Sequence, residues 1–597
     1  MSQGRRPRPG ATRPRPPRRR PQRGISLVRL RIGFLLIAIV ISVFAVRLFQ
    51  LQSVDAATYV AKARAEGVVT VDLPATRGRI TDRNGVALAD SVDGLMIVAD
   101  PTLTSPNASR IATIIARRLD LDYFDVLAKL RKPFTRFQYI ARRVPATRAS
   151  EVVAAIRAAG LSGVDTRRDP VRSYPADDVA ANLVGFMNAE GDAAEGAELM
   201  FDRTLKGQDG SATYEVGGGN RIPLGDNSTV EPRSGKDVAL TIDRDVQWYT
   251  QRVLRSAVQG SAAASGSAVV MDTRTGELLA LADFPSYDAN QPGLSPAKDL
   301  GSRATRDAYE PGSVEKVLTA AALIDAGKVT PDTRITVPPV LPRGDRVIHD
   351  YFPHERLRLT LTGVIAKSSN IGTVLAADEF SPRELHDYLS GFGLGARTGL
   401  GVEGETGGIL ADWRRWSQIN QDTIAFGQGV SVNAVQMAAA VNTIANGGVY
   451  VAPSLVKGLA TTAAGAEVGS GTTTERRVVS ARAASLTASM MEAVTDPEVG
   501  TASSAGIEGY RVAGKTGTAQ QVDPKCRCYG EKFTVSFAGF APADQPRFLV
   551  YVVVNKPAQG GGGSIGGPAF KKIMGYVLQK YAVPPTGTKA PTPTITW

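Results

Sequence analysis

The residues best suited to chemistry lie at the start of an apolar segment, Glu310–Gly327. Pro311 and Gly312 predict a turn, after which apolar residues recur at helical spacing to the end of the segment. Ser313 would therefore occupy the first turn of a buried helix, with Lys316 one turn along the same face. A serine hydroxyl needs a neighbouring base to become a nucleophile, and a lysine enclosed by apolar side chains has a lowered pKa that suits this task. The pair predicts a nucleophile for acyl transfer.

A Ser-x-x-Lys motif alone is weak, because about two would arise by chance in a chain of this length. Ser295 and Lys298 form a second such motif, with no apolar helix behind it. The alternative for Ser313 is a structural N-cap of its helix. Its assignment as a nucleophile therefore depends on other motifs.

Two further motifs would supply the polar groups that an acyl-transfer nucleophile requires. Ser368 and Asn370 follow an apolar helix expected over Leu359–Lys367, where a serine can share protons and an asparagine can orient an amide. Lys515–Thr518 reads Lys-Thr-Gly-Thr and continues an expected strand, and Lys-Thr-Gly occurs once in the chain. Gly517 lacks a side chain, so a substrate could lie against the strand there.

The elements expected around these motifs predict an α+β domain. Helices are expected over Asp245–Val258 and Ala569–Tyr581, with a helix-rich region between the Ser313 helix and about Ala445. Two groups of antiparallel strands with helices between them predict a sheet covered by helices on both faces. The expected strands are Val238–Ile242, Ser267–Asp272, Leu278–Asp283, Tyr510–Gly514, Thr534–Phe540 and Phe548–Val554.

The N-terminal region carries most of the net charge. The chain has a net charge of +13, and residues 1–31 hold eleven arginines and no acid, which leaves 13 − 11 = +2 for the remainder. Residues 1–26, rich in Arg and Pro, are expected to be a disordered cytoplasmic tail. Contact of this tail with nucleic acid or anionic lipid is the alternative, although no specific nucleic acid partner is expected.

A membrane anchor is expected next to this tail. Ile32–Val46 has no charged residue, and the wider helix over residues 27–51 is long enough to span a bilayer. A cleaved signal peptide is the alternative, but no clear small-x-small cleavage site follows directly. We expect a single-pass signal anchor, with the N-terminus in the cytoplasm and the chain from about residue 53 outside.

The remaining chain is expected to form two domains and a short tail. Residues 52–235 would be a non-catalytic pedestal, in which Thr76–Ala89 forms two short strands around an Arg-Asn-Gly turn. Residues 53–240 contain no histidine and no adjacent Glu-Asp pair, which speaks against a second enzyme there. Residues 236–582 would be the catalytic domain and residues 583–597 a flexible C-terminal tail.

Cysteine and histidine usage gives no sign of a metal site. The two cysteines, Cys526 and Cys528, could form a tight disulfide or remain reduced, and the sequence does not decide between these states. The three histidines show no ligand spacing with them. We expect neither a metal nor another cofactor.

The order of the three motifs resembles that of penicillin-binding proteins and β-lactamases, which carry Ser-x-x-Lys, Ser-x-Asn and Lys-Thr-Gly. The chain resembles a class B penicillin-binding protein, a membrane-anchored D,D-transpeptidase of bacterial cell-wall synthesis, over nearly everything from Arg47 to Lys580. Arg77–Gly85 resembles the pedestal segment of that family. Three later conserved segments of the family are matched by Leu240–Asp243, Gly427–Gly429 and Phe537–Pro542.

The Arg/Pro-rich tail and single anchor resemble the division-specific, FtsI-like branch from high-GC Gram-positive bacteria. One departure from the family stands beside the nucleophile, because many members carry Thr-Phe where this chain has Val314 and Glu315. An acid next to Lys316 would raise the pKa of that lysine.

The resemblance implies roles for the matching residues. Ser313 would attack the carbonyl between the two terminal D-alanines of a peptidoglycan stem peptide, and Lys316 would accept its proton. Ser368 would relay a proton to the leaving D-alanine, and Asn370 would hold the substrate amide. Lys515 would supply positive potential near the substrate carboxylate. Thr516 and Thr518 would bind that carboxylate, and the backbone N–H groups of Ser313 and Thr518 would form the oxyanion hole.

The resemblance also implies partners and a location. The partners would be stem peptides ending in D-alanyl-D-alanine, β-lactams, a membrane-embedded FtsW-like SEDS glycosyltransferase and other divisome proteins. The catalytic domain would lie outside the plasma membrane, at the division septum. The alternatives are an elongation-specific transpeptidase, a β-lactamase, a bifunctional glycosyltransferase–transpeptidase, and a non-catalytic scaffold or β-lactam sensor. The acceptor diamino acid, a requirement for a partner and the oligomeric state stay open.

Overall fold

The computed structural model of the chain describes residues 26–55, 57–58, 68–188, 190–217, 220–221, 227–344, 346–523, 526 and 528–597. The N-terminal tail expected to be disordered lies outside these residues, apart from Ser26. The chain forms two compact units, one of Met1–Asp72 with Ser211–Val230 and one of Leu73–Gly210 with Glu231–Trp597.

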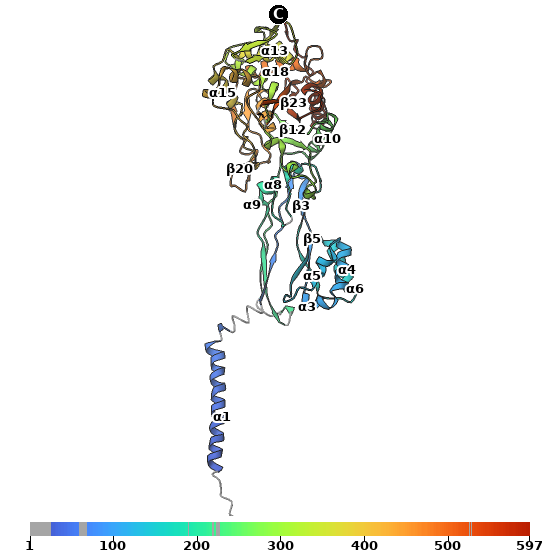
Figure 1. The fold of residues 1–597 in the computed structure, drawn as a ribbon, viewed down its shortest axis with the longest axis vertical. Helices are drawn as coiled ribbons and strands as arrows, with labels where there is room; N and C mark the ends of the chain where they lie inside the picture. The colour runs from blue at the N-terminus through green and yellow to red at the C-terminus, as the bar shows by residue number, and fades with distance from the viewer. Residues whose placement is uncertain are drawn as a thin grey trace, which may run out of the picture. The chain divides into compact units, whose positions relative to one another are not determined.

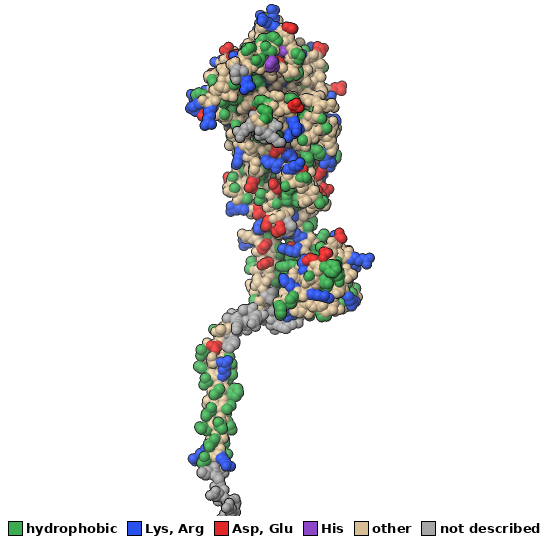
Figure 2. All heavy atoms as spheres, viewed as in Figure 1, with side chains coloured by type: hydrophobic (Ala, Val, Ile, Leu, Met, Phe, Trp, Pro, Cys, Tyr) green, Lys and Arg blue, Asp and Glu red, His purple; other side chains and the backbone are tan. Residues whose placement is uncertain are grey.

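The first unit contains a long apolar helix where the membrane anchor is expected. Helix α1 (Ser26–Phe49) is continued by a π-helical turn over Gln50–Val54. The apolar stretch Leu27–Val54 is 28 residues long, none of it is buried, and it is long enough to cross a bilayer. Figure 2 shows hydrophobic side chains along α1 and basic side chains at both of its ends. A small sheet follows in this unit, in the order β1-β8-β10 with β9 beside β8 (β1 Val68–Leu73, β8 Gly210–Gly217, β9 Asn220–Arg221, β10 Ser228–Val230).

The second unit begins with the expected hairpin over Thr76–Ala89. Strand β2 (Ile80–Thr81) pairs antiparallel with β3 (Ala87–Val92), and Gly85 has φ +83° in the turn, a conformation that favours glycine. Strand β11 is limited to Val238–Ala239, shorter than expected, because Leu240 pairs instead with Val456. The sheet order is β11-β2-β3-β7, with β7 at Val171–Ser173.

A helical subdomain with its own hydrophobic core is inserted between these strands. Its sheet has the order β5-β4-β6 and packs against helices through buried isoleucines such as Ile111 and Ile156. The elements are β4 (Gly94–Ala99), β5 (Gln138–Pro145), β6 (Val164–Arg168), α3 (Pro101–Thr104), α4 (Ala108–Leu119), α5 (Tyr123–Leu130) and α6 (Ala146–Ala158). The short helices α7 (Ala181–Val184), α8 (Gly196–Met200) and α9 (Asp202–Leu205) follow this subdomain.

The motif-bearing domain is built on a five-stranded antiparallel sheet of order β13-β12-β24-β23-β22 (Figure 1). The hairpin expected over residues 267–283 and the two later strands are confirmed. The edge strand β22 begins at Ala513 rather than at Tyr510, because its partner β23 ends at Ala541 and offers no residue to pair with Tyr510. The strands are β12 (Ser265–Asp272), β13 (Leu278–Phe284), β22 (Ala513–Asp523), β23 (Cys528–Ala541) and β24 (Phe548–Asn555).

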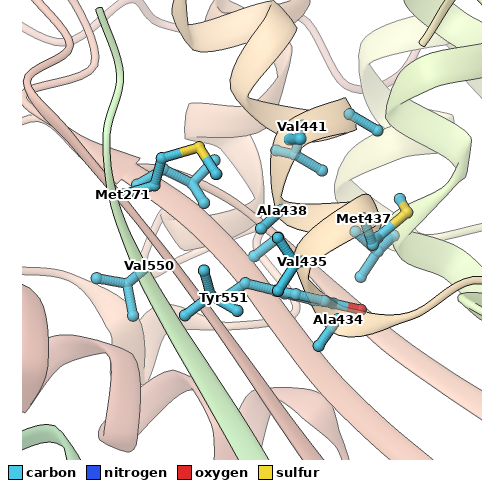
Figure 3. Close-up of a cluster of buried hydrophobic side chains, with 14 of the residues drawn as sticks. Met271, Ala434, Val435, Met437, Ala438, Val441, Val550 and Tyr551 are labelled. Atoms are coloured by element: carbon cyan, nitrogen blue, oxygen red, sulfur yellow. The ribbon is translucent and has the colours of Figure 1, made fainter. Parts of the chain in front are cut away.

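Helices cover both faces of this sheet, as expected. On one face, α17 (Ala434–Ala445) packs against Met271 and Tyr551 (Figure 3). Phe537 pairs with Val552, the residue after Tyr551, so its side chain points to the opposite face of the sheet. There its ring packs against Phe570 of α19 (Gly567–Lys580), with 4.9 Å between the ring centroids. The expected amphipathic helix is α10 (Arg244–Gly260). The remaining helices are α11 (Arg303–Arg306), α12 (Lys316–Asp325), α13 (Leu361–Lys367), α14 (Asn370–Ala377), α15 (Pro382–Gly391), α16 (Gln418–Ile424) and α18 (Ala481–Thr495).

The last residues of the segment 583–597, which is expected to be a flexible tail, pair with another part of the chain. Thr596 pairs antiparallel with Leu359 of β17 (Leu357–Thr360), which precedes α13. Leu359 and Thr360 thus belong to a strand, and the apolar helix expected over Leu359–Lys367 begins at Leu361. The other short strands are β14 (Arg334–Val337), which pairs with β17, β15 (Leu341–Arg343), β16 (Arg346–Ile348), β18 (Val449–Val451), β19 (Ala460–Thr461), β20 (Glu467–Val468) and β21 (Glu475–Arg477).

Candidate active site

Ser313 lies in a 3₁₀ turn, Gly312–Val314, immediately before α12. The turn is held in place because the N–H of Gly312 donates to the carbonyl of Gly427 at 2.9 Å, and Gly312 adopts φ +56°. The side chain of Ser313 lines a cavity of about 1300 Å³. Within the described residues its hydroxyl makes no hydrogen bond, so it can approach a ligand in the cavity. Four other sequence-predicted residues line the same cavity: Ser368, Asn370, Thr516 and Thr518.

Lys316 is completely buried on the first turn of α12. Its Nζ donates to the carbonyl of Ser368 at 2.6 Å and to Oδ1 of Asn370 at 2.7 Å, and lies 3.4 Å from Ser368 Oγ. Burial lowers the pKa of Lys316 to about 7, although the nearby Asp350 and Glu315 oppose the shift. A neutral amine has two N–H donors and one lone pair. The two short contacts use both donors and leave the lone pair free to accept a proton.

Lys515 reaches the same serine from the sheet. Its Nζ, also fully buried, donates to Ser368 Oγ at 2.8 Å and to the carbonyl of Thr516 at 3.1 Å. Burial lowers the pKa of Lys515 well below its usual value, and the neighbouring Lys316 lowers it further. Neither lysine forms an ion pair with a carboxylate of the described residues. Ser368 Oγ therefore lies between two amines that cannot easily carry charge together, an arrangement suited to moving a proton.

Ser368 lies where the chain changes direction between helices α13 and α14. It ends α13 with φ +58°, a left-handed conformation that is uncommon for a residue other than glycine. This conformation lets both its carbonyl and its hydroxyl face the lysines. Asn370, two residues later, begins α14 and donates its amide N–H to the carbonyl of His349 at 2.8 Å.

Asp350, whose side chain is fully buried, belongs to the site although the sequence did not indicate it. Its carboxylate accepts hydrogen bonds from the hydroxyl of Ser369 at 2.7 Å and from the N–H of Ile371 at 3.0 Å, and it pairs with His354 at 3.0 Å. It thereby fixes the loop between α13 and α14 that carries the Ser-x-Asn motif. No local pattern marks Asp350, because it lies in an irregular segment that approaches the motif only in the folded chain.

Gly517 has a packing role, and the space for a substrate that the sequence suggested there stays a prediction. A Cβ atom at this position would lie 2.3 Å from Ser536 Oγ, 2.9 Å from a methyl of Val314 and 3.0 Å from the carbonyl of Pro311. The glycine thus lets β22 pack directly against the turn that carries Ser313. This contact places the Lys-Thr-Gly strand beside the predicted nucleophile.

Glu315, the departure from the family pattern, is fully buried immediately before α12. Burial raises the pKa of Glu315 well above its usual value. Thr319 Oγ lies 2.8 Å from its carboxyl and 3.0 Å from the carbonyl of Ala425. The Thr319 hydroxyl has one proton and donates it to one of these two acceptors. The Glu315 carboxyl works against the lowered pKa of Lys316, and burial of the lysine outweighs this effect.

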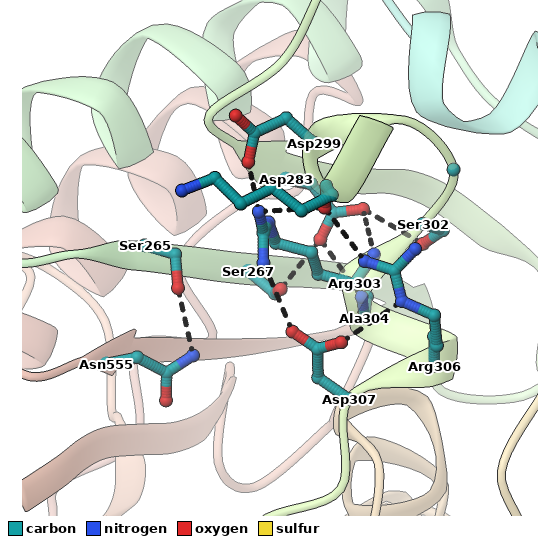
Figure 4. Close-up of polar contacts among 12 residues, drawn as sticks. Ser265, Ser267, Asp283, Asp299, Ser302, Arg303, Ala304, Arg306, Asp307 and Asn555 are labelled. Carbon is teal, nitrogen blue, oxygen red and sulfur yellow. Dashed lines mark hydrogen bonds and ion pairs between the residues drawn. The ribbon is translucent and has the colours of Figure 1, made fainter. Parts of the chain in front are cut away.

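The segment that leads to Ser313 is held by a buried carboxylate at the end of β13. Asp283 accepts hydrogen bonds from the hydroxyls of Ser267 at 2.7 Å and Ser302 at 2.9 Å (Figure 4). It also accepts from the N–H groups of Arg303 and Ala304, each at 3.0 Å, at the start of α11. Burial raises the pKa of Asp283 to about 6 even though these hydrogen bonds oppose the shift. The four donors fix the chain that enters the Ser313 turn.

One wall of the cavity is formed by the end of the β22–β23 hairpin. Cys526 and Cys528 form a disulfide there, which settles the state that the sequence left open. Tyr529 follows the disulfide, lines the cavity and donates its hydroxyl to Glu310 at 3.1 Å. Glu310 also accepts from the N–H of Gly429 at 2.9 Å. These contacts link the hairpin, through Glu310, to the segment just before Ser313 and to Gly429.

The three motifs therefore meet around one cavity beside β22, the edge strand of an antiparallel sheet. This is the arrangement of a penicillin-binding site. Comparison with known families agrees with this class. The penicillin binding protein transpeptidase domain matches residues 266–575, and the penicillin-binding protein dimerisation domain matches residues 72–240.

Curated relatives and solved structures extend the match over most of the chain. The penicillin-binding protein PbpB of Mycolicibacterium smegmatis is 36% identical, over 93% of this chain and 91% of its own length. The peptidoglycan D,D-transpeptidase FtsI of Escherichia coli K12 is also 36% identical, over 85% of this chain and 84% of its own. A crystal structure of penicillin binding protein 3 from Mycobacterium tuberculosis, complexed with aztreonam, has a TM-score of 0.68 at 31% identity and covers 88% of this chain and 99% of that one. The chain belongs to the class B penicillin-binding protein transpeptidases, in the FtsI-like branch.

Proposed function

We propose that this protein is a peptidoglycan D,D-transpeptidase that crosslinks stem peptides through an acyl-enzyme on Ser313. The observation that carries the proposal is the position of Ser368 Oγ, 2.8 Å from Lys515 Nζ and 3.4 Å from Lys316 Nζ, in the cavity that Ser313 lines. A nucleophile, a base with a lowered pKa and a proton relay are the parts that acyl transfer needs.

In the acylation half-reaction, Ser313 Oγ attacks the carbonyl carbon of the penultimate D-alanine while Lys316 takes the hydroxyl proton. The tetrahedral intermediate would place its oxyanion between the backbone N–H groups of Ser313 and Thr518. Its collapse breaks the C–N bond to the terminal D-alanine. The leaving nitrogen receives the proton from Lys316 through Ser368.

In the transfer half-reaction, an amine of a neighbouring stem attacks the acyl carbon. The amine gives a proton to Lys316, the bond to Ser313 Oγ breaks, and the serine regains its proton. The net change exchanges one amide for another and releases D-alanine, so the chemistry needs no co-reactant. Asn370 would orient the donor peptide, while Lys515, Thr516 and Thr518 would bind its terminal carboxylate.

A β-lactam would enter the same cycle because its ring amide resembles the D-alanyl-D-alanine end. Its acyl-enzyme would persist, since the leaving nitrogen stays tethered. Labelling with fluorescent penicillin tests the assignment: wild-type protein should be labelled at Ser313, and Ser313→Ala should abolish labelling. Ser295→Ala is a matched control, because it removes the serine of the second Ser-x-x-Lys motif. Undiminished labelling of Ser313→Ala would refute the nucleophile.

We also propose that the chain acts at the division septum, anchored by α1 with its catalytic domain outside the membrane. The relatives named FtsI support this role, and the apolar helix near the N-terminus supports the anchor. A pedestal over residues 52–235 and a catalytic domain over residues 236–582 are the corresponding domains. A tagged copy should accumulate at midcell, and a Ser313→Ala copy that still supported division would favour a scaffold role instead. Distribution along the side wall would indicate elongation.

A further inference from the structure

The segment Thr594–Trp597 contacts the element that leads to Ser368. The N–H of Thr360 donates to the carbonyl of Ile595 at 3.0 Å, and the N–H of Trp597 donates to the carbonyl of Arg358 at 3.3 Å. The segment thus adds an antiparallel bridge, between Thr596 and Leu359, to the edge of the β14–β17 sheet. The indole of Trp597 lies beneath the guanidinium groups of Arg334 and Arg358, 5.2 and 5.3 Å from its centroid.

Thr360 connects this strand to helix α13. Its hydroxyl donates to the carbonyl of Thr594 and accepts from the N–H of Gly363 at 3.0 Å, which makes it the N-cap of the helix. One side chain therefore joins the C-terminal segment to the first turn of α13. Loss of the segment would leave this cap with one contact fewer and the strand edge unpaired.

Gly363 leaves room for the C-terminal segment because it has no side chain. It lies inside α13, where glycine is an unfavourable residue, and a Cβ there would lie 2.1 Å from the carbonyl oxygen of Ile595. The missing side chain forms a notch into which the backbone of Ile595 fits. A glycine in an otherwise apolar helix is thus explained by the docked segment.

The far end of the same helix carries Ser368. Helix α13 has seven residues, so its start and end are about 10 Å apart. A short helix transmits a displacement of its first turn to its last, and Ser368 must contact Lys316 and Lys515 at once. We propose that residues 594–597 are a positioning strand, which sets the location of α13 and thereby that of Ser368 between the two lysines.

The inference rests on the proposed acyl-transfer function, and a truncation tests it. A variant that lacks only residues 594–597 should react with fluorescent penicillin at least about tenfold more slowly than wild type. Small misplacements of a catalytic group have effects of this size. The midpoint of its pH–rate profile should also move, since Ser368 contacts both lysines. A purely structural role would lower the melting temperature without moving that midpoint.

Rescue in trans separates positioning from misfolding. A synthetic peptide of residues 590–597 should restore the rate of the truncated chain, but it should not restore a truncated chain that also carries Gly363→Ala, whose new Cβ fills the notch. In the intact chain, Gly363→Ala should reproduce the slow rate and the shifted midpoint. Thr588→Val is the matched control, because Thr588 contacts Asp544 and Arg511 rather than α13 and should leave the rate unchanged.

The outcomes distinguish this inference from the function on which it rests. A truncated chain that reacts at the wild-type rate with an unchanged pH midpoint would overturn the positioning strand. A peptide that rescues the Gly363→Ala truncation equally well would overturn the notch. If the intact chain is not labelled at all, the proposed acyl-enzyme itself fails.

Discussion

At the scale of single residues, the site depends on two buried lysines that meet at one serine. Two ammonium groups in this position would repel each other, and neither lysine forms an ion pair with a carboxylate of the described residues. Desolvation therefore favours the neutral amine, and the pKa of Lys316 falls to about 7. The sequence indicated Lys316 because an apolar helix surrounds it. It could not indicate Asp350, whose contacts with Ser369 and Ile371 form only in the folded chain.

The lowered pKa of Lys316 predicts the pH dependence of acylation. The base acts when it is neutral, and its neutral fraction rises as the pH rises towards about 7. The acylation rate with fluorescent penicillin should therefore increase about tenfold per pH unit below this value and level off above it.

Lys316→Arg keeps a positive charge at every accessible pH, so the rate should fall by about 10² to 10⁴-fold. Lys571→Met, at an exposed position of α19, should keep the wild-type profile. A flat profile for the wild type between pH 5 and 7 would exclude Lys316 as the base.

At the scale of elements, β22 and the Ser313 turn must pack closely for the motifs to meet. Gly517→Ala introduces a Cβ that would lie 2.3 Å from Ser536 Oγ and 2.9 Å from a methyl of Val314. We expect the turn to move away from the strand, with a loss of about 1–3 kcal/mol in the free energy of unfolding. Acylation should slow by at least about tenfold. Kinetics with fluorescent penicillin and denaturant unfolding measure the two effects.

A second glycine provides the control for this substitution. Gly575 lies within helix α19 and has no atom within 4 Å of the position that a Cβ would take. Gly575→Ala should therefore stabilise the chain by about 0.5–1 kcal/mol and leave acylation unchanged. Equal acylation rates for Gly517→Ala and wild type would show that the close packing of β22 does not position Ser313.

Helices and strands could be predicted from the sequence where a local periodicity of apolar residues determined them. The β12–β13 hairpin and helix α10 follow from alternation and helical periodicity, and the structure confirms both. The start of β22 could not be predicted, because it depends on where its partner strand ends. The docking of residues 594–597 was also not predictable, since backbone pairing with β17 and a notch at Gly363 leave no periodic signal in the tail.

At the scale of the whole molecule, the chain combines an apolar helix, a dimerisation-type domain and a transpeptidase domain. Sequence alone indicated the apolar helix, because the charge and composition of the first 51 residues differ sharply from those of the rest. The order of the two domains followed from the position of the motifs and from the family resemblance. The reaction acts on peptidoglycan, which lies outside the plasma membrane. The orientation of α1 is thus a condition for the proposed function.

The distribution of charge around α1 predicts that orientation. Eleven arginines precede or begin the apolar stretch, and positive charge next to a span is retained in the cytoplasm. Protease added to spheroplasts should therefore digest a C-terminal epitope and spare an N-terminal one, whereas inverted vesicles should give the opposite result. Replacement of the eleven arginines by glutamine should weaken this preference, while replacement of the same number of polar residues beyond residue 236 should not. Protection of the C-terminal epitope in intact spheroplasts would place the catalytic domain away from peptidoglycan and contradict the proposed function.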